Sequence, residues 1–464
     1  MSKSFETNDS DKGKPPTAEN LPSSPLRAVV VSVVIGVSCA GVMFVYNLPG
    51  ALALGLEDEY QISSGDIATL MTAYTLPSTV TAVIAAQLLA LLGLNSISVI
   101  CSVLVLLGSL AFALAPHFSP SQPMSLMIGA QLINGSGDPL GLACSPAMVS
   151  RWWRHNHSGL AMGTTLMVTQ LVGSFLPFIL LPRVQASLGL GSALWVGTLA
   201  QLVAFAFLVL YIRLERCNEE YLRLVDEVDS RREDSSSTAK PVGFFTCGSN
   251  LKAIPVNAWL QIVAVCLIPV TQYVSLALLP AYLSETHGMS AVEAGDATSM
   301  VWWFCVTAPL WGMVADSPYF GRLHIQLVGA IVAASCFLCL GFGISEWWVL
   351  VTMGLSFAML DQNSYVCVEA LVPDPTLIDF AYGVMGAVFN VGLGSISYLA
   401  GRVSMEQMPF IYASSLGFGI VITALLLLRI SSVDGIQKGL LPRPRPSRED
   451  ARSALVHAGQ QTDA

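Results

Sequence analysis

Residues 67–137 read IATLMTAYTLPSTVTAVIAAQLLALLGLNSISVICSVLVLLGSLAFALAPHFSPSQPMSLMIGAQLINGSG. These 71 residues contain no Lys, Arg, Asp or Glu, and only short turn-like patches interrupt them. A water-soluble domain carries charged side chains on its surface at closer intervals than this. A helix needs about 20 apolar residues to cross the hydrocarbon core of a bilayer. We therefore predict that this stretch crosses a membrane more than once.

The composition of the whole chain agrees with an integral membrane protein. Of its 464 residues, 53% are hydrophobic and 11% are charged, whereas soluble proteins carry about 25% charged residues. The net charge of -9 comes mostly from loops and tails, so it does not predict a nucleic-acid partner. Eight of the ten cysteines lie in apolar runs, where packing is their ordinary role.

Apolar runs of sufficient length number twelve, which predicts an all-α membrane protein with two six-helix bundles. The first six runs are Ala28–Gly50, Ile67–Leu91, Ser96–Ala115, Met124–Val149, Leu160–Pro182 and Leu190–Ile212. The last six are Val256–Leu283, Ala297–Ala315, Leu323–Ile344, Trp347–Leu371, Phe380–Gly401 and Pro409–Leu428.

The charged residues divide the chain into five parts. We predict a tail over 1–27, bundles over 28–212 and 256–429, a linker over 213–255 and a second tail over 430–464. With the N-terminus in the cytosol, 20 of the 22 Lys and Arg residues lie on the cytosolic side. Because positive charge favours that side, both tails and the linker are predicted to be cytosolic.

The two halves resemble copies of one unit. Four features of the first half recur in the second, at offsets of 230, 223, 220 and 219 residues. The pairs are Gly65-Asp66 with Gly295-Asp296 before the second helix of each half, Asp138 with Asp361, Gly163 and Gln170 with Gly383 and Asn390, and Arg183 with Arg402. Parallel six-helix repeats around a central pathway are typical of a transporter.

Two acids mark the candidate site. Asp138 and Asp361 lie near the middle of the fourth and tenth predicted helices. A carboxylate at that depth costs about 2.5 to 3.5 kcal/mol even on a lenient scale, so it normally faces a cavity. Uncharged side chains that can contact a polar solute lie on other helices: Tyr46, Asn47, Tyr74, Gln170, Tyr273 and Asn390. For each of these alone, an interhelical hydrogen bond is an equally good interpretation.

An enzymatic interpretation is weaker. Gly135-Ser136-Gly137-Asp138 matches the G-x-G-D string of intramembrane aspartic proteases, whose chemistry needs a second Asp. In those proteases the partner Asp precedes the string, whereas Asp361 follows it. No Walker-type loop is present, so ATP is not expected to drive transport and no cofactor is expected.

The segment Gly312-Met313-Val314-Ala315-Asp316, followed by Gly321-Arg322, resembles the cytoplasmic loop motif of the major facilitator superfamily. We interpret Asp316 and Arg322 as a gating pair and assign Glu369, nearer the cytosolic end of its helix, to the inner gate. The corresponding loop of the first half, from Gln87 to Gly93, lacks both charges of the motif.

More narrowly, the chain resembles the lysosomal dipeptide transporter family, the major facilitator superfamily domain-containing protein 1 type. The similar segments are residues 381–385, 390–393 and 400–401, Tyr46-Asn47 with Pro49, and Gly137-Asp138. This resemblance implies a lysosomal or other endomembrane location, with the plasma membrane as the alternative, and a glycosylated accessory membrane protein as partner. It also implies a Glu in helix four and an Arg in helix five that bind the ends of a dipeptide. Asp138 and Gln170 occupy those places here.

The resulting hypothesis is a secondary transporter that works by alternating access. Its substrate is a small polar solute, most readily a dipeptide, including those with basic residues, or an amino acid. Uniport and proton coupling both remain open. The alternative is a transporter-like membrane sensor or scaffold that binds a solute without translocating it.

Overall fold

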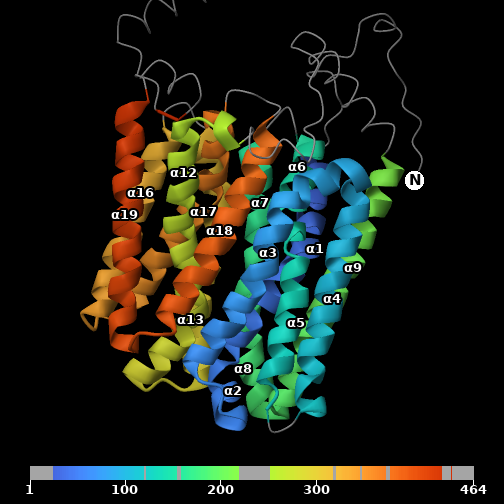
Figure 1. Cartoon of the computed structure of the whole chain (residues 1–464), viewed down its shortest axis with the longest axis vertical. Helices are drawn as coiled ribbons and strands as arrows, with labels where there is room; N and C mark the ends of the chain where they lie inside the picture. Colours follow the sequence, from blue (N-terminus) through green and yellow to red (C-terminus); the bar gives the residue numbers. More distant parts are fainter. Residues whose placement is uncertain are drawn as a thin grey trace, which may run out of the picture.

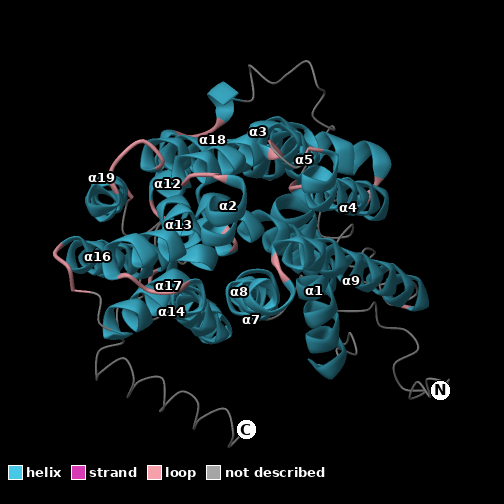
Figure 2. Cartoon of the chain, turned by 90° about the horizontal axis from the view of Figure 1, so that it is seen from below, coloured by secondary structure: helices cyan, strands magenta, loops and turns pink. Residues whose placement is uncertain are grey.

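A computed structural model of the chain describes residues 25–119, 122–153, 158–218, 251–316, 320–344, 347–372, 377–430 and 440–441. Within these ranges the regular secondary structure is helical. Figures 1 and 2 show two bundles side by side, one built from the first half of the chain and one from the second.

The first bundle contains α1 (Pro25–Ala51), α2 (Ala53–Tyr60), α3 (Ser64–Leu92), α4 (Leu94–Phe118), α5 (Met124–Ser136), η3 (Leu140–Cys144), α6 (Ser145–Trp153), α7 (Ser158–Gln170), η4 (Leu171–Phe175), α8 (Leu176–Leu188) and α9 (Leu190–Cys217). The second contains α12 (Val256–Leu267), α13 (Pro269–His287), α14 (Ala291–Trp303), η6 (Phe304–Thr307), α15 (Ala308–Asp316), α16 (Arg322–Gly341), α17 (Trp347–Leu371), α18 (Ile378–Ala400), η8 (Met405–Gln407) and α19 (Met408–Arg429).

Each of the twelve predicted spans coincides with one helix or with a run of consecutive helical segments. Ten helical runs of the described residues are long and apolar enough to cross a membrane. The two remaining spans are the acid-bearing ones, α5 to α6 with Asp138 and α17 with Asp361. The prediction of twelve helices in two bundles is confirmed, and the protein is a multi-pass integral membrane protein.

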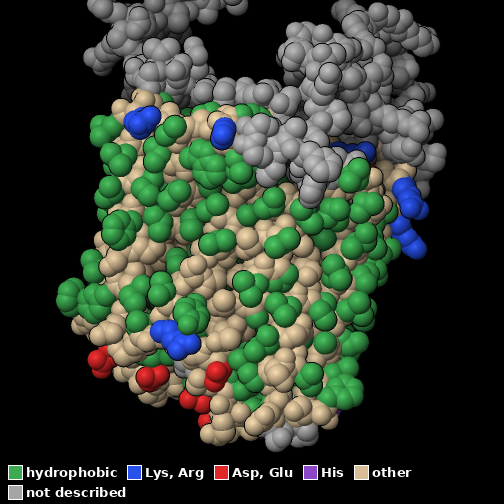
Figure 3. All heavy atoms as spheres, in the orientation of Figure 1, with side chains coloured by type: hydrophobic (Ala, Val, Ile, Leu, Met, Phe, Trp, Pro, Cys, Tyr) green, Lys and Arg blue, Asp and Glu red, His purple; other side chains and the backbone are tan. Residues whose placement is uncertain are grey.

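The outer surface suits a bilayer. Figure 3 shows charged side chains toward the two ends of the molecule and hydrophobic or uncharged side chains between them. Large apolar side chains are exposed on this belt, among them Leu107, Leu199, Leu310 and Val421. In water such an area would favour association, but in a membrane it contacts acyl chains. We call the end that carries the start of α1 and the end of α19 the cytosolic end, following the charge-based prediction.

The second helix of each half begins earlier than predicted. Gly65-Asp66 and Gly295-Asp296 were expected before these helices, but they lie inside α3 and α14. The reason is a capping box at each start. Ser63 and Asp66 bond each other's backbone N–H groups at α3, and Ser290 and Glu293 do so at α14, which satisfies donors that have no partner within the helix.

Four predicted spans are interrupted near their middle. The fourth has a turn at Gly137-Asp138 and then the π-helix η3, and the fifth contains the π-helix η4. The seventh is divided at Ile268, and the eighth contains the 3₁₀ segment η6. Hydropathy reports only that a segment is apolar, so it predicts these spans as continuous. Such irregular turns inside helices frequently accompany functional sites.

The two bundles contact each other toward both ends. α3 packs along α18, α7 packs against α15, and α8 packs against α14. Figure 1 shows α7 nearer the cytosolic end than α8. In the second half, α14 begins the eighth span and α15 ends it, so the α7–α15 contact lies nearer the cytosolic end than the α8–α14 contact. Side chains between the bundles are therefore enclosed, and the conformation is occluded.

Two glycines of α5 provide a matched test of this packing. A Cβ at Gly135 would collide with the carbonyl oxygen of Tyr74 on α3, whereas a Cβ at Gly129 would meet no atom within 4 Å. We expect Gly135→Ala to lower the free energy of unfolding by about 1 to 3 kcal/mol. Gly129→Ala gains helix propensity, about 1 kcal/mol at most, and should be neutral or stabilising. Thermal unfolding of the purified variants in detergent measures both effects, and equal midpoints would contradict the packing.

Candidate functional site

Asp138 lies at the turn between α5 and η3, flanked by Gly137 and Pro139. The absence of a side chain at Gly135 lets α5 approach α3, where Ser78 Oγ donates to the Gly135 carbonyl oxygen at 2.9 Å. This approach brings the Tyr74 hydroxyl to Asp138, and it donates to Oδ1 at 2.8 Å. One carboxylate oxygen is thus held by a neighbour in the same half.

The other oxygen of Asp138 is bonded from the second half. Asn390 on α18 donates its Nδ2 to Asp138 Oδ2 at 3.2 Å. The Asp138 side chain is nearly enclosed, with 7% of the residue exposed. The sequence predicted that this carboxylate faces a cavity, but in the occluded conformation it lies in a closed contact between the bundles. The structural reason is that the bundles meet at this point, and Tyr74 and Asn390 each donate a hydrogen bond to the carboxylate.

Asp361 on α17 is linked to the first half through one intermediate hydroxyl. Tyr273 on α13 donates from its hydroxyl to Asp361 Oδ2 at 3.0 Å. Gln170, the last residue of α7, donates from Nε2 to the Tyr273 hydroxyl oxygen at 2.7 Å. The Tyr273 ring packs edge-on against Phe357 and Phe389, with centroids 5.0 and 5.7 Å away. These rings fix the hydroxyl that joins the two halves.

Gln170 is oriented from within its own half. Ser174 on η4 donates from Oγ to Gln170 Oε1 at 2.7 Å. Asn47 on α1 in turn donates from Nδ2 to Ser174 Oγ at 3.0 Å. Tyr46, next to Asn47, packs its ring edge-on against Tyr74 at 5.3 Å. Gln170, Asn47 and Tyr46 are buried.

These contacts form two buried sets, one around Asp138 and one around Asp361, which adjoin through the neighbouring residues Tyr46 and Asn47 of α1. We call the seven predicted binding residues and Tyr74 together the central polar network: Tyr46, Asn47, Tyr74, Asp138, Gln170, Tyr273, Asp361 and Asn390. Ser174 was not predicted, although its position four residues after Gln170 puts it on the same helix face. The roles assigned to these residues in solute binding remain predictions.

The network follows the repeat of the sequence. The acid of helix four bonds an amide of helix eleven, and the acid of helix ten reaches an amide of helix five through Tyr273. Asp138 and Asp361 are repeat mates, and so are Asn390 and Gln170. Each half therefore contains one acid that is connected to an amide of the other half, either directly or through Tyr273.

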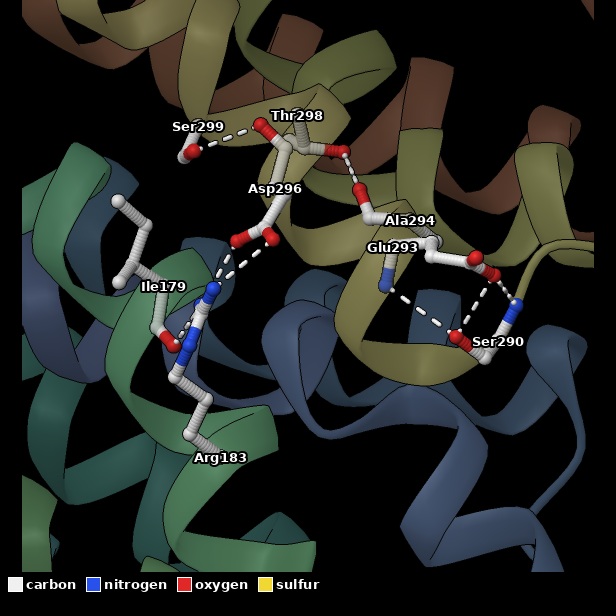
Figure 4. A network of polar contacts seen from close by, with 8 residues as sticks. All are labelled: Ile179, Arg183, Ser290, Glu293, Ala294, Asp296, Thr298 and Ser299. Atoms are coloured by element: carbon white, nitrogen blue, oxygen red, sulfur yellow. Dashed lines mark hydrogen bonds and ion pairs between the residues drawn. The ribbon is translucent and has the colours of Figure 1, made fainter.

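A separate link between the halves lies away from the cytosolic end. Arg183 on α8 binds Asp296 on α14 in a bidentate ion pair, with Nη1 to Oδ1 at 2.7 Å and Nη2 to Oδ2 at 2.9 Å. Figure 4 shows this pair beside the capping box of Ser290 and Glu293. Both side chains are partly exposed, at 47% and 45%. The sequence marked both residues as members of the repeat but did not pair them.

The repeat mates of this pair have different partners. Asp66 accepts from the backbone N–H and hydroxyl of Ser63 at the start of α3. The Arg402 guanidinium lies 4.9 Å from the centre of the Tyr398 ring. In α14 the capping role belongs to Glu293, which leaves the Asp296 carboxylate available for Arg183. Because Glu293 caps α14 while Asp66 itself caps α3, Asp296 can form an ion pair with Arg183, whereas Asp66 is occupied by Ser63.

Of the three residues predicted for the inner gate, the structure describes the side chain of Arg322. The side chains of Asp316 and Glu369 lie outside the described residues. Arg322 begins α16 and is half-buried. At the same end, Arg151 at the end of α6 forms an ion pair with Glu215 on α9, which also accepts from Asn95 Nδ2 at 2.6 Å. The gating role of Asp316, Arg322 and Glu369 remains a prediction.

Comparison with known proteins gives concordant matches. The family model of the Major Facilitator Superfamily matches residues 33–397. The protein named lysosomal dipeptide transporter MFSD1 of Bos taurus is 23% identical over 93% of this chain and 91% of its own length. The protein of the same name from Homo sapiens is 23% identical over 96% of this chain and 95% of its own.

Solved structures show the same fold. A D-xylose-proton symporter superimposes with a TM-score of 0.66 at 15% identity, over 89% of this chain and 99% of its own. The E. coli xylose transporter XylE, in a partially occluded inward-open conformation, gives a TM-score of 0.65 at 14% identity, over 88% of this chain and 100% of its own. With the family match over most of its length, the two-bundle fold and the polar residues between the bundles, this chain belongs to the Major Facilitator Superfamily of transporters.

Proposed function

We propose that this carrier moves dipeptides, and other small solutes with a cationic amino group, and that Asp138 and Asp361 receive that group. One observation carries the proposal: each half holds one buried acid that is connected to an amide of the other half, Asp138 directly to Asn390 and Asp361 to Gln170 through the Tyr273 hydroxyl. A membrane-buried acid is usually functional. The relatives named lysosomal dipeptide transporters support the choice of solute and a lysosomal location.

The same bonds connect binding to movement. In alternating access the bundles rock about a central site, so Asp138 and Asn390 must separate during the cycle. An amino group offers three N–H donors and can replace the Asn390 amide at Asp138 without leaving the carboxylate unsatisfied. Because this exchange conserves hydrogen bonds, it lowers the cost of breaking the contact between the halves. Tyr46, Asn47, Gln170 and Tyr273 complete the proposed binding site.

The two ends of the molecule supply the gates in this proposal. Arg183 with Asp296 holds the non-cytosolic side closed, and Asp316, Arg322 and Glu369 act at the cytosolic side. Transport by rocking needs no covalent chemistry, so we propose no enzymatic activity. The glycosylated accessory membrane protein is implied by the family resemblance, and uniport is the transport mode that we propose.

The acids are tested by Asp138→Asn and Asp361→Asn. Removing the charge removes an ionic hydrogen bond worth about 1.5 to 3 kcal/mol, so uptake of labelled dipeptide into vesicles at low substrate should fall by at least about tenfold. Asp58→Asn, on the exposed acidic end of α2, serves as the matched control and should leave uptake unchanged.

Two results would contradict the proposal in different ways. Unchanged uptake by a folded Asp138→Asn protein removes that acid from the site. Binding of dipeptide without uptake by the unmodified protein favours the sensor or scaffold alternative.

The non-cytosolic gate is tested by hydrogen exchange. An exposed ion pair stabilises by up to about 1 kcal/mol, so Asp296→Asn should increase the open population by at most about fivefold. Exchange of the peptides covering α8 and α14 should rise in Asp296→Asn and in Arg183→Gln. The charge swap of Arg183→Asp with Asp296→Arg should restore protection.

The repeat mate provides the control for this experiment. Asp66→Asn removes a carboxylate that caps α3 within its own half, so faster exchange should be confined to the start of that helix. If Asp66→Asn increased exchange of α8 and α14 as much as Asp296→Asn does, the ion pair would not be the specific lock.

A further inference from the structure

The central polar network contains two acids and no base. The buried charged residues of the described chain are Asp138, Asp361 and Glu215. Glu215 is matched by Arg151 near the cytosolic end. Arg183 is engaged by Asp296 at the opposite end, and Arg322 lies at the start of α16. The middle of the described molecule therefore holds two acidic groups without a fixed basic one.

The hydrogen-bond inventory of the network has the same bias. Its amide donors are used, because Asn390 Nδ2 donates to Asp138, Gln170 Nε2 to Tyr273 and Asn47 Nδ2 to Ser174. Two acceptor oxygens are not used: Asp361 Oδ1 and Asn47 Oδ1 are buried and have no hydrogen-bond partner among the described residues. The Tyr46 hydroxyl, which can donate as well as accept, has none either.

Unused buried acceptors lower stability, because the hydrogen bonds they made with water are not replaced, unless another molecule supplies donors. An ammonium group has three donors and no acceptor, whereas an ionised carboxylate has acceptors only. The ammonium group complements the network in charge and in hydrogen bonding. The carboxylate adds an unpaired anion beside two acids, and burying such a charge is strongly unfavourable.

We propose that this site recognises the amino group of its solute and discriminates against a free carboxylate. Amines and peptides with an amidated C-terminus should therefore bind more tightly than the corresponding free acids. Asp361 Oδ1 is the acceptor that we assign to a second cationic group, such as a basic side chain. This inference depends on the proposed function, because it requires the central polar network to be the solute site.

The experiment compares three probes on the purified full-length protein by isothermal titration calorimetry. The probes are lysyl-alanine, lysyl-alanine amide and N-acetyl-alanyl-alanine. We expect the amide to bind at least tenfold more tightly than the free acid, and the acetylated peptide, which lacks a cationic group, to show no binding. The unmodified protein is used, so the comparison does not depend on the folding of a variant.

The outcomes separate this inference from the function on which it rests. If lysyl-alanine binds more tightly than its amide, the discrimination against carboxylates is wrong while peptide binding stands. If none of the three probes binds and labelled dipeptide is not taken up by vesicles, the proposed function fails and the inference fails with it.

Two variants at Gln170 test whether charge causes the discrimination against carboxylates. Gln170→Arg places a cation in the network and should shift the affinity ratio of free acid to amide by at least tenfold toward the free acid. Gln170→Met, of similar length and without charge or amide, removes the same hydrogen bonds and should leave that ratio unchanged. Because the readout is a ratio of affinities, a general loss of stability does not imitate the expected shift. An equal ratio in both variants would overturn the role of charge.

Discussion

A polar group inside a bilayer must find its hydrogen-bond partner within the protein, because no water is available there. In this carrier the two buried acids of the central polar network meet that constraint in part through the opposite bundle. Asp138 is bonded by Asn390, and Asp361 is connected to Gln170 through Tyr273. The two halves thus replace solvent for each other. The Asn390–Asp138 and Gln170–Tyr273 hydrogen bonds consequently both hold the bundles together and support the buried acids.

In the proposed mechanism this arrangement relates solute binding to movement. A bundle rocks away from its partner when solute or water replaces the hydrogen-bond donors that it removes from an acid. The central residues sit where helices are interrupted, at the turn before η3 and at the junction of α7 with η4. These interruptions place Asp138 between Tyr74 and Asn390, and Gln170 between Ser174 and Tyr273. The interruptions of the helices therefore position two residues of the central polar network, Asp138 and Gln170.

The repeat gives the molecule its plan but not its symmetry in detail. Both second helices begin with a capping box, yet Asp66 serves as the capping acid in the first half and Glu293 does so in the second. Asp296 is consequently available to Arg183, whereas Arg402 lies against Tyr398. The family match covers the common plan. Among the described residues the central polar network holds two acids and no buried base accompanies them, and this balance is what directs the proposed selectivity toward amines.

The amino-acid sequence by itself determined the number and the approximate positions of the membrane-spanning segments, because hydropathy is a local property and each apolar run is visible without coordinates. The capped starts of α3 and α14 and the interruptions within four spans were decided by the structure. The sequence also located Asp138 and Asp361, since a charge within an apolar run is unusual wherever the chain folds. Only the tertiary structure decided which groups these acids bond. Asn390 is 252 residues from Asp138, and Tyr273 is 103 residues from Gln170. Such partners are set by how helices from different halves pack and where they are interrupted, and no local pattern encodes that geometry.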